Sequence, residues 1–223
     1  MTKELVVSSY FDDKARYIED ISWLNRIDPS IKIYLYNKNE NNHYPNSIHL
    51  PNIGREGHTY IQHICENYDT LSEYLFFFQG YPFDHTGSCI EIINEDLDIW
   101  NLKSQLRFDG YWGYCHNYFG TMWNLDKAIE FEGDCLRCDK NGKPHHHENI
   151  PCWQLWEEMF DCEIPETLEF NPGNQFNVSR DLIKQRGLDF WKKLLALSYT
   201  RELWPWELER LMPYMMNPKY KSK

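Results

Sequence analysis

The chain has 223 residues, a formal net charge of −11 and 42% hydrophobic residues. A chain of this length can bury a sizeable core as one domain. Its acidic balance lacks the basic surface that general nucleic-acid binding or attachment to an anionic membrane requires. No apolar run approaches the roughly 18 residues of a transmembrane helix, so we expect no membrane span.

The first half of the chain predicts alternating strands and helices. The predicted strands are short, apolar and rich in β-branched or aromatic residues, and the longer helix has one apolar face. This alternation is typical of the α/β class, with a mostly parallel central sheet flanked by helices. The segments are strands over residues 5–10, 31–36 and 75–78, with helices over residues 18–24 and 60–68 between them.

The second half is less regular. We expect one domain over residues 1–223 with an irregular insertion at about 103–151, rich in aromatic, cysteine and histidine residues. Within it, residues 111–123 predict an aromatic loop. Its rings, together with Phe108, either stack on sugar faces or simply pack. The rings in question are Phe108, Tyr111, Trp112, Tyr114, Tyr118 and Trp123. After the insertion come a helix at 153–160, a strand at 175–178, a long helix from the cap Ser179 to about Ser198, and a helix at 202–216.

The N-terminal residues favour an intracellular location. Residues 1–7 lead into the first strand and lack the long apolar stretch of a secretory signal. We therefore expect a cytoplasmic protein whose seven cysteines are thiols.

The segment Asn52–Gly57 carries the first functional signal. It places two glycines around Arg55 and Glu56, just before a predicted helix. A guanidinium offers two parallel donors to a phosphate, and the N–H groups at a helix start add to them. The segment therefore predicts an anion-binding loop. The alternative is a structural Arg55–Glu56 pair that fixes the loop.

The loop Gln79–His85 carries the second signal. It follows the apolar strand at 75–78, and open α/β sheets place their ligand sites on loops that follow such strands. Asp84 and His85 are candidate ligands for a metal such as Mn²⁺. Alternatively, His85 binds the substrate while Asp84 orients it. An Asp84-capped turn after Pro82 is the purely structural alternative.

Two patterns carry a resemblance to a known family. They are Asn-x-Gly-Arg-Glu-Gly-x-Thr-Tyr at residues 52–60 and Phe-x-Gln-Gly-x-Pro-Phe-x-His at residues 77–85. With residues 172–180 and 208–212, they resemble a family of largely uncharacterised proteins similar to GT-A glycosyltransferases. The resemblance implies a GT-A-like fold over the whole chain. It also implies transfer of a sugar from a nucleotide-sugar to a glycan or protein acceptor.

The chain departs from GT-A enzymes at one motif. Those enzymes usually carry Asp-x-Asp after the third or fourth strand, to hold a divalent metal against the diphosphate, and here that place reads Gln79–His85. Dependence on Mn²⁺ or Mg²⁺ is therefore open. The resemblance implies that Arg55 binds the diphosphate and that Asp84 and His85 are catalytic residues or metal ligands. The residues predicted to contact the substrate are Tyr10, Asp12, Asn52, Gly54, Arg55, Glu56, Tyr60, Gln79, Gly80 and Arg180.

Two further candidates stand outside these patterns. Asp181, at a strand-to-helix junction, is a candidate catalytic base, or else a charge that stabilises the helix start. Zinc is a weaker candidate, because the ligand types are present but half of the spacing is irregular. Its ligands would be Cys135, Cys138, His145 and Cys152.

Two other classes of function are compatible with the sequence. One is a non-catalytic module that binds nucleotides or carbohydrates and lacks the Asp-x-Asp motif. The other is a metal-dependent hydrolase, although the spacing of its ligands matches no metal motif. Those ligands would be His58, Asp84, His85 and His116.

Overall fold

The structure is a computed structural model. It describes residues 1–10, 21–40, 46–95, 105–114, 120–123, 130–131, 150–165 and 167–223. Among these residues, no helix has the length and apolar character needed to cross a bilayer.

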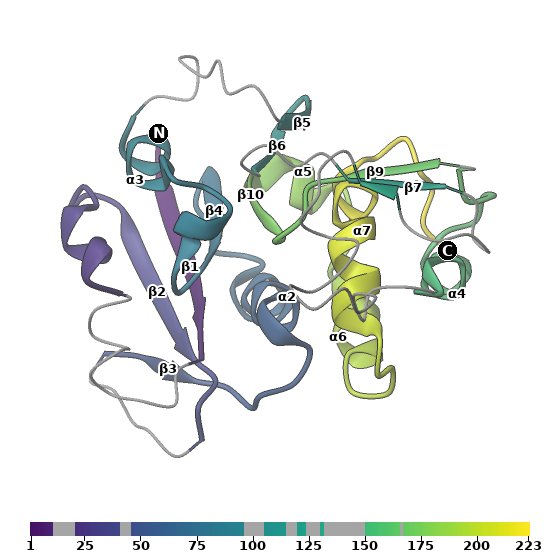
Figure 1. The fold of residues 1–223 in the computed structure, drawn as a ribbon, viewed down its shortest axis with the longest axis horizontal. Helices are drawn as coiled ribbons and strands as arrows, with labels where there is room; N and C mark the ends of the chain where they lie inside the picture. Colours follow the sequence, from purple (N-terminus) through teal and green to yellow (C-terminus); the bar gives the residue numbers. More distant parts are fainter. Residues whose placement is uncertain are drawn as a thin grey trace.

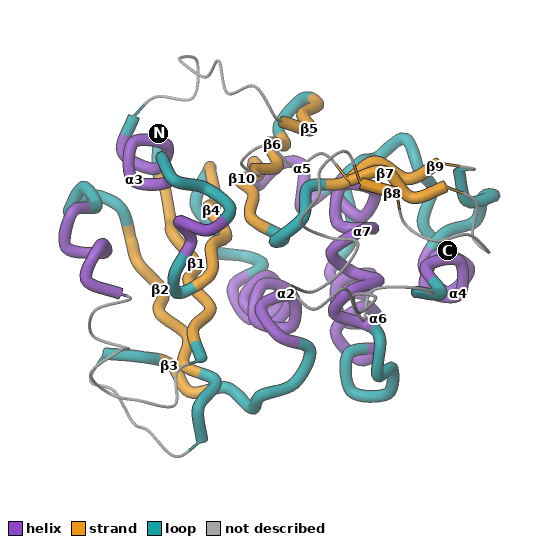
Figure 2. Tube along the Cα trace, viewed as in Figure 1, coloured by secondary structure: helices purple, strands orange, loops and turns teal. Residues whose placement is uncertain are grey.

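In the described part of the chain, a seven-stranded sheet forms the centre of the molecule, in the order β3-β2-β1-β4-β10-β6-β5 (Figures 1 and 2). The pairs β3–β2, β2–β1 and β1–β4 are parallel, whereas β4–β10, β10–β6 and β6–β5 are antiparallel. The prediction of a mostly parallel sheet is therefore wrong, and the sheet is mixed. The strands are β1 Lys3–Ser9, β2 Lys32–Asn37, β3 Ile48–His49, β4 Tyr74–Gln79, β5 Gln105–Phe108, β6 Tyr111–Tyr114 and β10 Gln175–Ser179.

Helices cover both faces of this sheet. Residues on alternate positions of each strand point to opposite faces, so Val6 and Phe77 join the core under α2, whereas Val7 and Phe78 join the core under η1 and α3. In Figure 1, α2 lies between the parallel strands and the pair α6 and α7. The helices are η1 Ser22–Arg26, α2 Arg55–Asn67, η2 Pro82–Asp84, α3 Cys89–Asn94, α4 Cys152–Met159, α5 Arg180–Lys184, α6 Leu188–Leu197 and α7 Trp204–Met216.

A second, three-stranded antiparallel sheet packs beside α7. Its order is β8-β7-β9, with β7 Gly120–Trp123, β8 Glu130–Phe131 and β9 Thr167–Phe170. The prediction of a loop over residues 111–123 is wrong, because β6 and β7 lie within this range. Gly113 is needed inside β6, since a Cβ there would lie 2.4 Å from Oδ1 of Asn171.

The predicted helix after Ser179 is interrupted. Ser179 caps α5 as expected, since its hydroxyl accepts a hydrogen bond from the N–H of Leu182. The helix ends before Gly187, and α6 begins after it. Between the two helices, the guanidinium of Arg186 donates hydrogen bonds to backbone carbonyls at the end of α7. This tertiary anchor replaces a continuous helix with two short ones.

The other predicted segments agree with the structure in position. The strands at 5–10, 31–36, 75–78 and 175–178 and the helices at 153–160 and 202–216 are confirmed within one or two residues at each end. The helix predicted over 60–68 begins earlier, at Arg55, and that predicted over 18–24 is described only as the short η1. The prediction of a single domain stays a prediction.

Candidate functional site

The carboxyl ends of three adjacent parallel strands meet at one edge of the sheet. The N–H of Lys38, just after β2, donates to the carbonyl of Ser9, and the N–H of Gly80, just after β4, donates to that of Ser8. A cleft of about 890 Å³ opens at this edge. The residues that line it are Ser8, Ser9, Tyr10, Lys38, Asn52, Gly54, Arg55, Glu56, Gln79, Gly80, Tyr81 and Asp84.

The first turn of α2 borders the cleft with two residues in the left-handed backbone region. Gly54 has φ 60° and Arg55 has φ 49°, a conformation that is uncommon for residues with a side chain. A Cβ on Gly54 would lie 2.9 Å from Cβ of His58 and 3.0 Å from the ring of Trp204. The tight contact between α2 and α7 thus requires the glycine, and it places Arg55 at the cleft.

Arg55 is exposed, and its guanidinium stacks on an aromatic ring. Its Cζ lies 4.8 Å from the ring centre of Trp206 in α7. A stacked guanidinium keeps its donors in its own plane, where they can form two parallel bonds with a phosphate. The geometry is therefore compatible with the predicted role in binding a diphosphate.

Lys38 is the cation on the floor of the cleft. Its side chain is only 2% exposed, and its ammonium donates hydrogen bonds to the carbonyls of Ile53 and Arg55. Burial lowers its pKa to about 8, and the nearby Glu56 opposes this shift. The sequence analysis did not select Lys38. A signal was nevertheless present in the sequence. Lys38 follows shortly after the strand predicted over residues 31–36, just as Gln79 follows the strand predicted over residues 75–78.

Glu56 is half-buried on the wall of the cleft. Burial raises the pKa of its carboxyl to about 7, and the negative charge of Glu209 adds to this effect, while Arg55 and Lys38 oppose it. A carboxyl group that titrates near neutral pH can both accept and release a proton under cellular conditions.

Gln79 and Gly80 lie at the end of β4, as predicted, and both are fixed by the neighbouring structure. The Gln79 amide donates to the carbonyl of Gly173 at 2.9 Å, and the Gly80 carbonyl accepts from the indole of Trp23 at 2.8 Å. Gly173 itself donates its N–H to Glu209 at 2.5 Å. Hydrogen bonds therefore connect the cleft residue Gln79, through Gly173 in the loop before β10, to helix α7.

The structure separates the two residues of the predicted metal pair. Asp84 is exposed and lines the cleft, whereas His85 packs against Gly173, where a Cβ would lie 2.5 Å from the imidazole ring. In the ranges that the structure describes, no three histidine, cysteine or acidic residues gather as a metal site. Of the pair, Asp84 is therefore the residue that lines the cleft, and a metal held by both residues stays a prediction.

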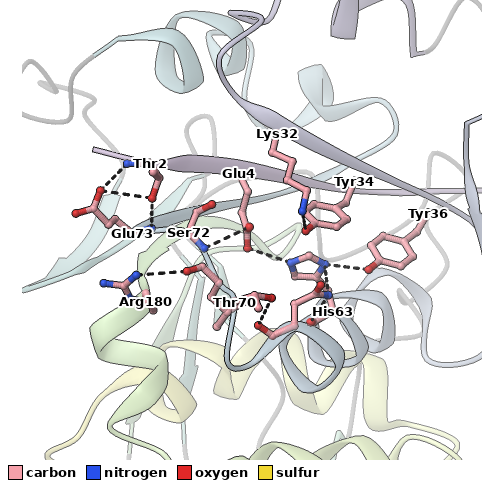
Figure 3. A network of polar contacts seen from close by, with 12 residues as sticks. Thr2, Glu4, Lys32, Tyr34, Tyr36, His63, Thr70, Ser72, Glu73 and Arg180 are labelled. Carbon is pink, nitrogen blue, oxygen red and sulfur yellow. Dashed lines mark hydrogen bonds and ion pairs between the residues drawn. The ribbon is translucent and has the colours of Figure 1, made fainter.

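Arg180 and Asp181 lie at the opposite edge of the sheet from the cleft. Strand β10 runs antiparallel to β4, so its end at Ser179 pairs with Tyr74, the first residue of β4. Arg180 there donates its N–H to the carbonyl of Glu73 and its guanidinium to that of Leu71, as Figure 3 shows beside Thr2 and Glu73. The structure does not bring either residue to the site.

Tyr60 also lies outside the cleft. It is fully buried in the core, with its ring 5.1 Å from that of Phe77 and 5.8 Å from that of Phe176. Its role is packing between α2 and the sheet. Asp12 falls outside the described residues.

The chain matches the family described as "Protein of unknown function (DUF3431)" over residues 14–221. The chain belongs to this family. Neither the curated proteins nor the solved structures that were searched gave a match. Membership is therefore shown, while the activity and the GT-A relationship stay proposals.

The hydrolase and zinc candidates gain no assembled site within the described ranges. His58 is buried, its Nε2 lies 3.1 Å from the Tyr199 hydroxyl, and burial lowers its pKa to about 4. His116 lies outside the described residues, as do Cys135, Cys138 and His145. Cys152 is buried at the start of α4, where burial raises its pKa to about 12.

The candidate sugar-stacking rings that the structure describes are packed in the core or beside it. Tyr111 and Tyr114 are 2% exposed, and Phe108 stacks on Tyr111 at 4.9 Å between ring centres. At the cleft itself the aromatic residues are Tyr10 and Tyr81, both exposed. Of these, the sequence analysis selected Tyr10 and missed Tyr81.

Proposed function

We propose that the protein binds a nucleotide-sugar in the cleft and transfers the sugar to a glycan or protein acceptor, as a GT-A-like glycosyltransferase. One observation carries the proposal. The cleft lies at the carboxyl ends of β2, β1 and β4, and the first turn of α2 and two cations, Lys38 and Arg55, border it. This edge of an α/β sheet is where such folds bind nucleotides.

The charges of the cleft suit the leaving group of this reaction. Sugar transfer breaks the bond between the anomeric carbon and the diphosphate, and the diphosphate leaves with additional negative charge. Cations and helix-start N–H groups that are already in place stabilise that charge. Arg55 and Lys38 are placed to do this.

A carboxylate is also available for the proton of the acceptor hydroxyl. Of the predicted catalytic residues, Asp84 is the one that lines the cleft, and it is the last residue of η2. We propose Asp84 as the group that accepts this proton when no metal is bound to it. Glu56, which titrates near neutral pH, is the second carboxyl group of the cleft.

A thermal-shift screen of nucleoside diphosphates and nucleotide-sugars tests the proposal. A ligand at 100 times its dissociation constant should stabilise the protein by about 2.7 kcal/mol. Release of nucleoside diphosphate in the presence of candidate acceptors then reports transfer. Binding without release would indicate a non-catalytic nucleotide-binding module, and the absence of any stabilising nucleotide would contradict the proposal.

The same screen, run with and without Mn²⁺ or Mg²⁺, addresses the metal. A divalent cation at Asp84 would have to complete its shell with phosphate oxygens and water. We therefore propose that Mn²⁺ binds the free protein poorly and binds better with a nucleoside diphosphate present. Asp84→Asn should remove this coupling and leave the melting temperature of the free protein unchanged. Tight Mn²⁺ binding by the free protein would refute this assignment.

A further inference from the structure

Among the described residues, Lys38 uses two of its three hydrogen-bond donors. An ammonium group carries three donors, and two of them go to the carbonyls of Ile53 and Arg55, the latter at 2.5 Å. Ile53 lies just before α2 and Arg55 is the first residue of that helix, so the start of α2 holds the ammonium in a fixed position. The same side chain lines the cleft.

The charge of Lys38 is buried without a matching ion pair. Among the described residues, no carboxylate oxygen forms a salt bridge with its ammonium. Burying a charge is costly unless an opposite charge or several hydrogen bonds compensate it. A negative charge that compensates the ammonium would have to approach it from the cleft, which Lys38 lines.

We propose that the Lys38 ammonium is the buried binding group for a phosphate of the ligand, and that it supplies there the positive charge that GT-A enzymes take from a metal at Asp-x-Asp. The choice of a nucleotide-sugar as ligand rests on the proposed function. The phosphate contact itself does not, because inorganic pyrophosphate should make it as well. Arg55, exposed at the rim, adds the second cation.

The binding of inorganic pyrophosphate in excess chelator tests the contact. Isothermal titration calorimetry near pH 7.5 should show that the unmodified protein binds it, and that Lys38→Met binds it at least about tenfold more weakly. Lys32→Met, at the exposed start of β2, the strand that Lys38 follows, is the matched control and should bind as the unmodified protein does. Equal binding by Lys38→Met and the unmodified protein would overturn the proposal.

A second measurement needs no change at Lys38, so it is independent of any folding defect. Phosphates have lost their second proton well below pH 7.5. The affinity for a nucleoside diphosphate should therefore fall as the pH rises from about 7.5 to 9.5, because Lys38 then loses its proton. The other groups that face the cleft are Glu56 and Arg55 from α2, Asp84 from η2, and the exposed Tyr10 and Tyr81.

Glu56→Gln separates the contributions to this pH profile. The fall should persist in that variant and begin at a lower pH, because the negative charge of Glu56 raises the pKa of Lys38 and the glutamine does not. A flat profile in both proteins would overturn the proposal. If pyrophosphate binds through Lys38 but no nucleotide-sugar binds, the proposed function fails and this inference stands. If a nucleotide-sugar binds equally well to Lys38→Met, the inference fails and the proposed function stands.

Discussion

Lys38 and Glu56 are both held in surroundings that disfavour their charged forms. Burial lowers the pKa of Lys38 and raises that of Glu56, although each opposes the shift of the other. Both groups are charged together between about pH 7 and 8, and in this range the burial of the two charges lowers the free energy of unfolding of the ligand-free protein most. An anionic ligand would stabilise the charged lysine and favour a protonated Glu56.

Glu56 makes a testable contribution to stability against pH. Its folded pKa is about 7, above the ordinary value of 4.5. The unfolded chain therefore loses this proton first, and the free energy of unfolding falls as the pH rises between these two values. We expect the stability of Glu56→Gln relative to the unmodified protein to increase from about pH 5 to about pH 8 in urea unfolding. Glu66→Gln, exposed on the same helix, should show no such trend.

Arg55 tests the role of the guanidinium. Arg55→Lys keeps the charge but loses the planar pair of donors and the stacking on Trp206. We expect about a tenfold loss of affinity for a nucleoside diphosphate, with little change in the melting temperature. Arg26→Lys, at an exposed position of η1, is the control. Normal ligand binding by Arg55→Lys would remove Arg55 from the site.

At the scale of elements, α2 is the part that builds the site, and it is fixed at both ends. Its first turn packs on α7 through Gly54 and Gly57, where added Cβ atoms would meet Trp204 and Leu208. Further along, His63 lies between Glu4 of β1 and Tyr36 of β2 (Figure 3). The start of α2 therefore cannot shift without breaking contacts to both the sheet and α7.

A pair of glycine substitutions tests the first of these anchors. Gly54→Ala places a Cβ in contact with His58 and Trp204 and in a left-handed backbone, so we expect a loss of about 1–3 kcal/mol in the free energy of unfolding. Gly187→Ala has φ −60° and nothing within 4 Å, so it should change stability by less than about 0.5 kcal/mol. Similar effects of both substitutions in chemical denaturation would contradict the packing described for Gly54.

The buried pair of Glu4 and His63 tests the second anchor. Nε2 of His63 lies 3.1 Å from Oε1 of Glu4, and both side chains are at most 1% exposed. The Glu4 carboxylate also accepts the N–H of Ser72. Glu4→Gln weakens both bonds, so we expect a loss of about 1–3 kcal/mol in the free energy of unfolding. Glu66→Gln should be neutral, and a neutral Glu4→Gln would show that the pair does not stabilise the fold.

At the scale of the whole molecule, the mixed sheet has two distinct edges, one that carries the cleft and one that is closed by hydrogen bonds. The cleft lies at the carboxyl ends of the parallel strands, whereas Thr2, Glu73 and Arg180 are joined at the opposite edge (Figure 3). The antiparallel β10 connects the two, because Gly173 in the loop before it holds Gln79 at the cleft and its last residue, Ser179, pairs at the far edge.

The redox state of the cysteines tests the predicted compartment of the whole protein. Cys65, Cys89, Cys152 and Cys162 form no disulfide in the described structure, and burial raises the pKa of Cys65 to about 11 and that of Cys89 to about 12. We expect the denatured, unreduced protein to titrate close to all seven cysteines. In the native protein, the exposed Cys162 should react much faster than Cys89 and Cys152. A count that is lower by pairs would contradict the predicted reducing, cytoplasmic compartment.

The sequence alone determined the features that depend on neighbouring residues. The apolar run at Leu75–Phe78 predicts a strand inside a sheet, and Asn52–Gly57 predicts a polar helix start, because periodicity and backbone preference are local properties. Seven of the residues predicted to contact the substrate accordingly line the cleft, namely Tyr10, Asn52, Gly54, Arg55, Glu56, Gln79 and Gly80, together with the predicted catalytic residue Asp84. The direction of β10, by contrast, is set by which strand it pairs with, about 100 residues earlier in the chain. Because of that pairing, Arg180 and Asp181 lie at the edge opposite the cleft. The packing of His85 against Gly173 and the contact of Lys38 with the start of α2 likewise exist only in the assembled fold.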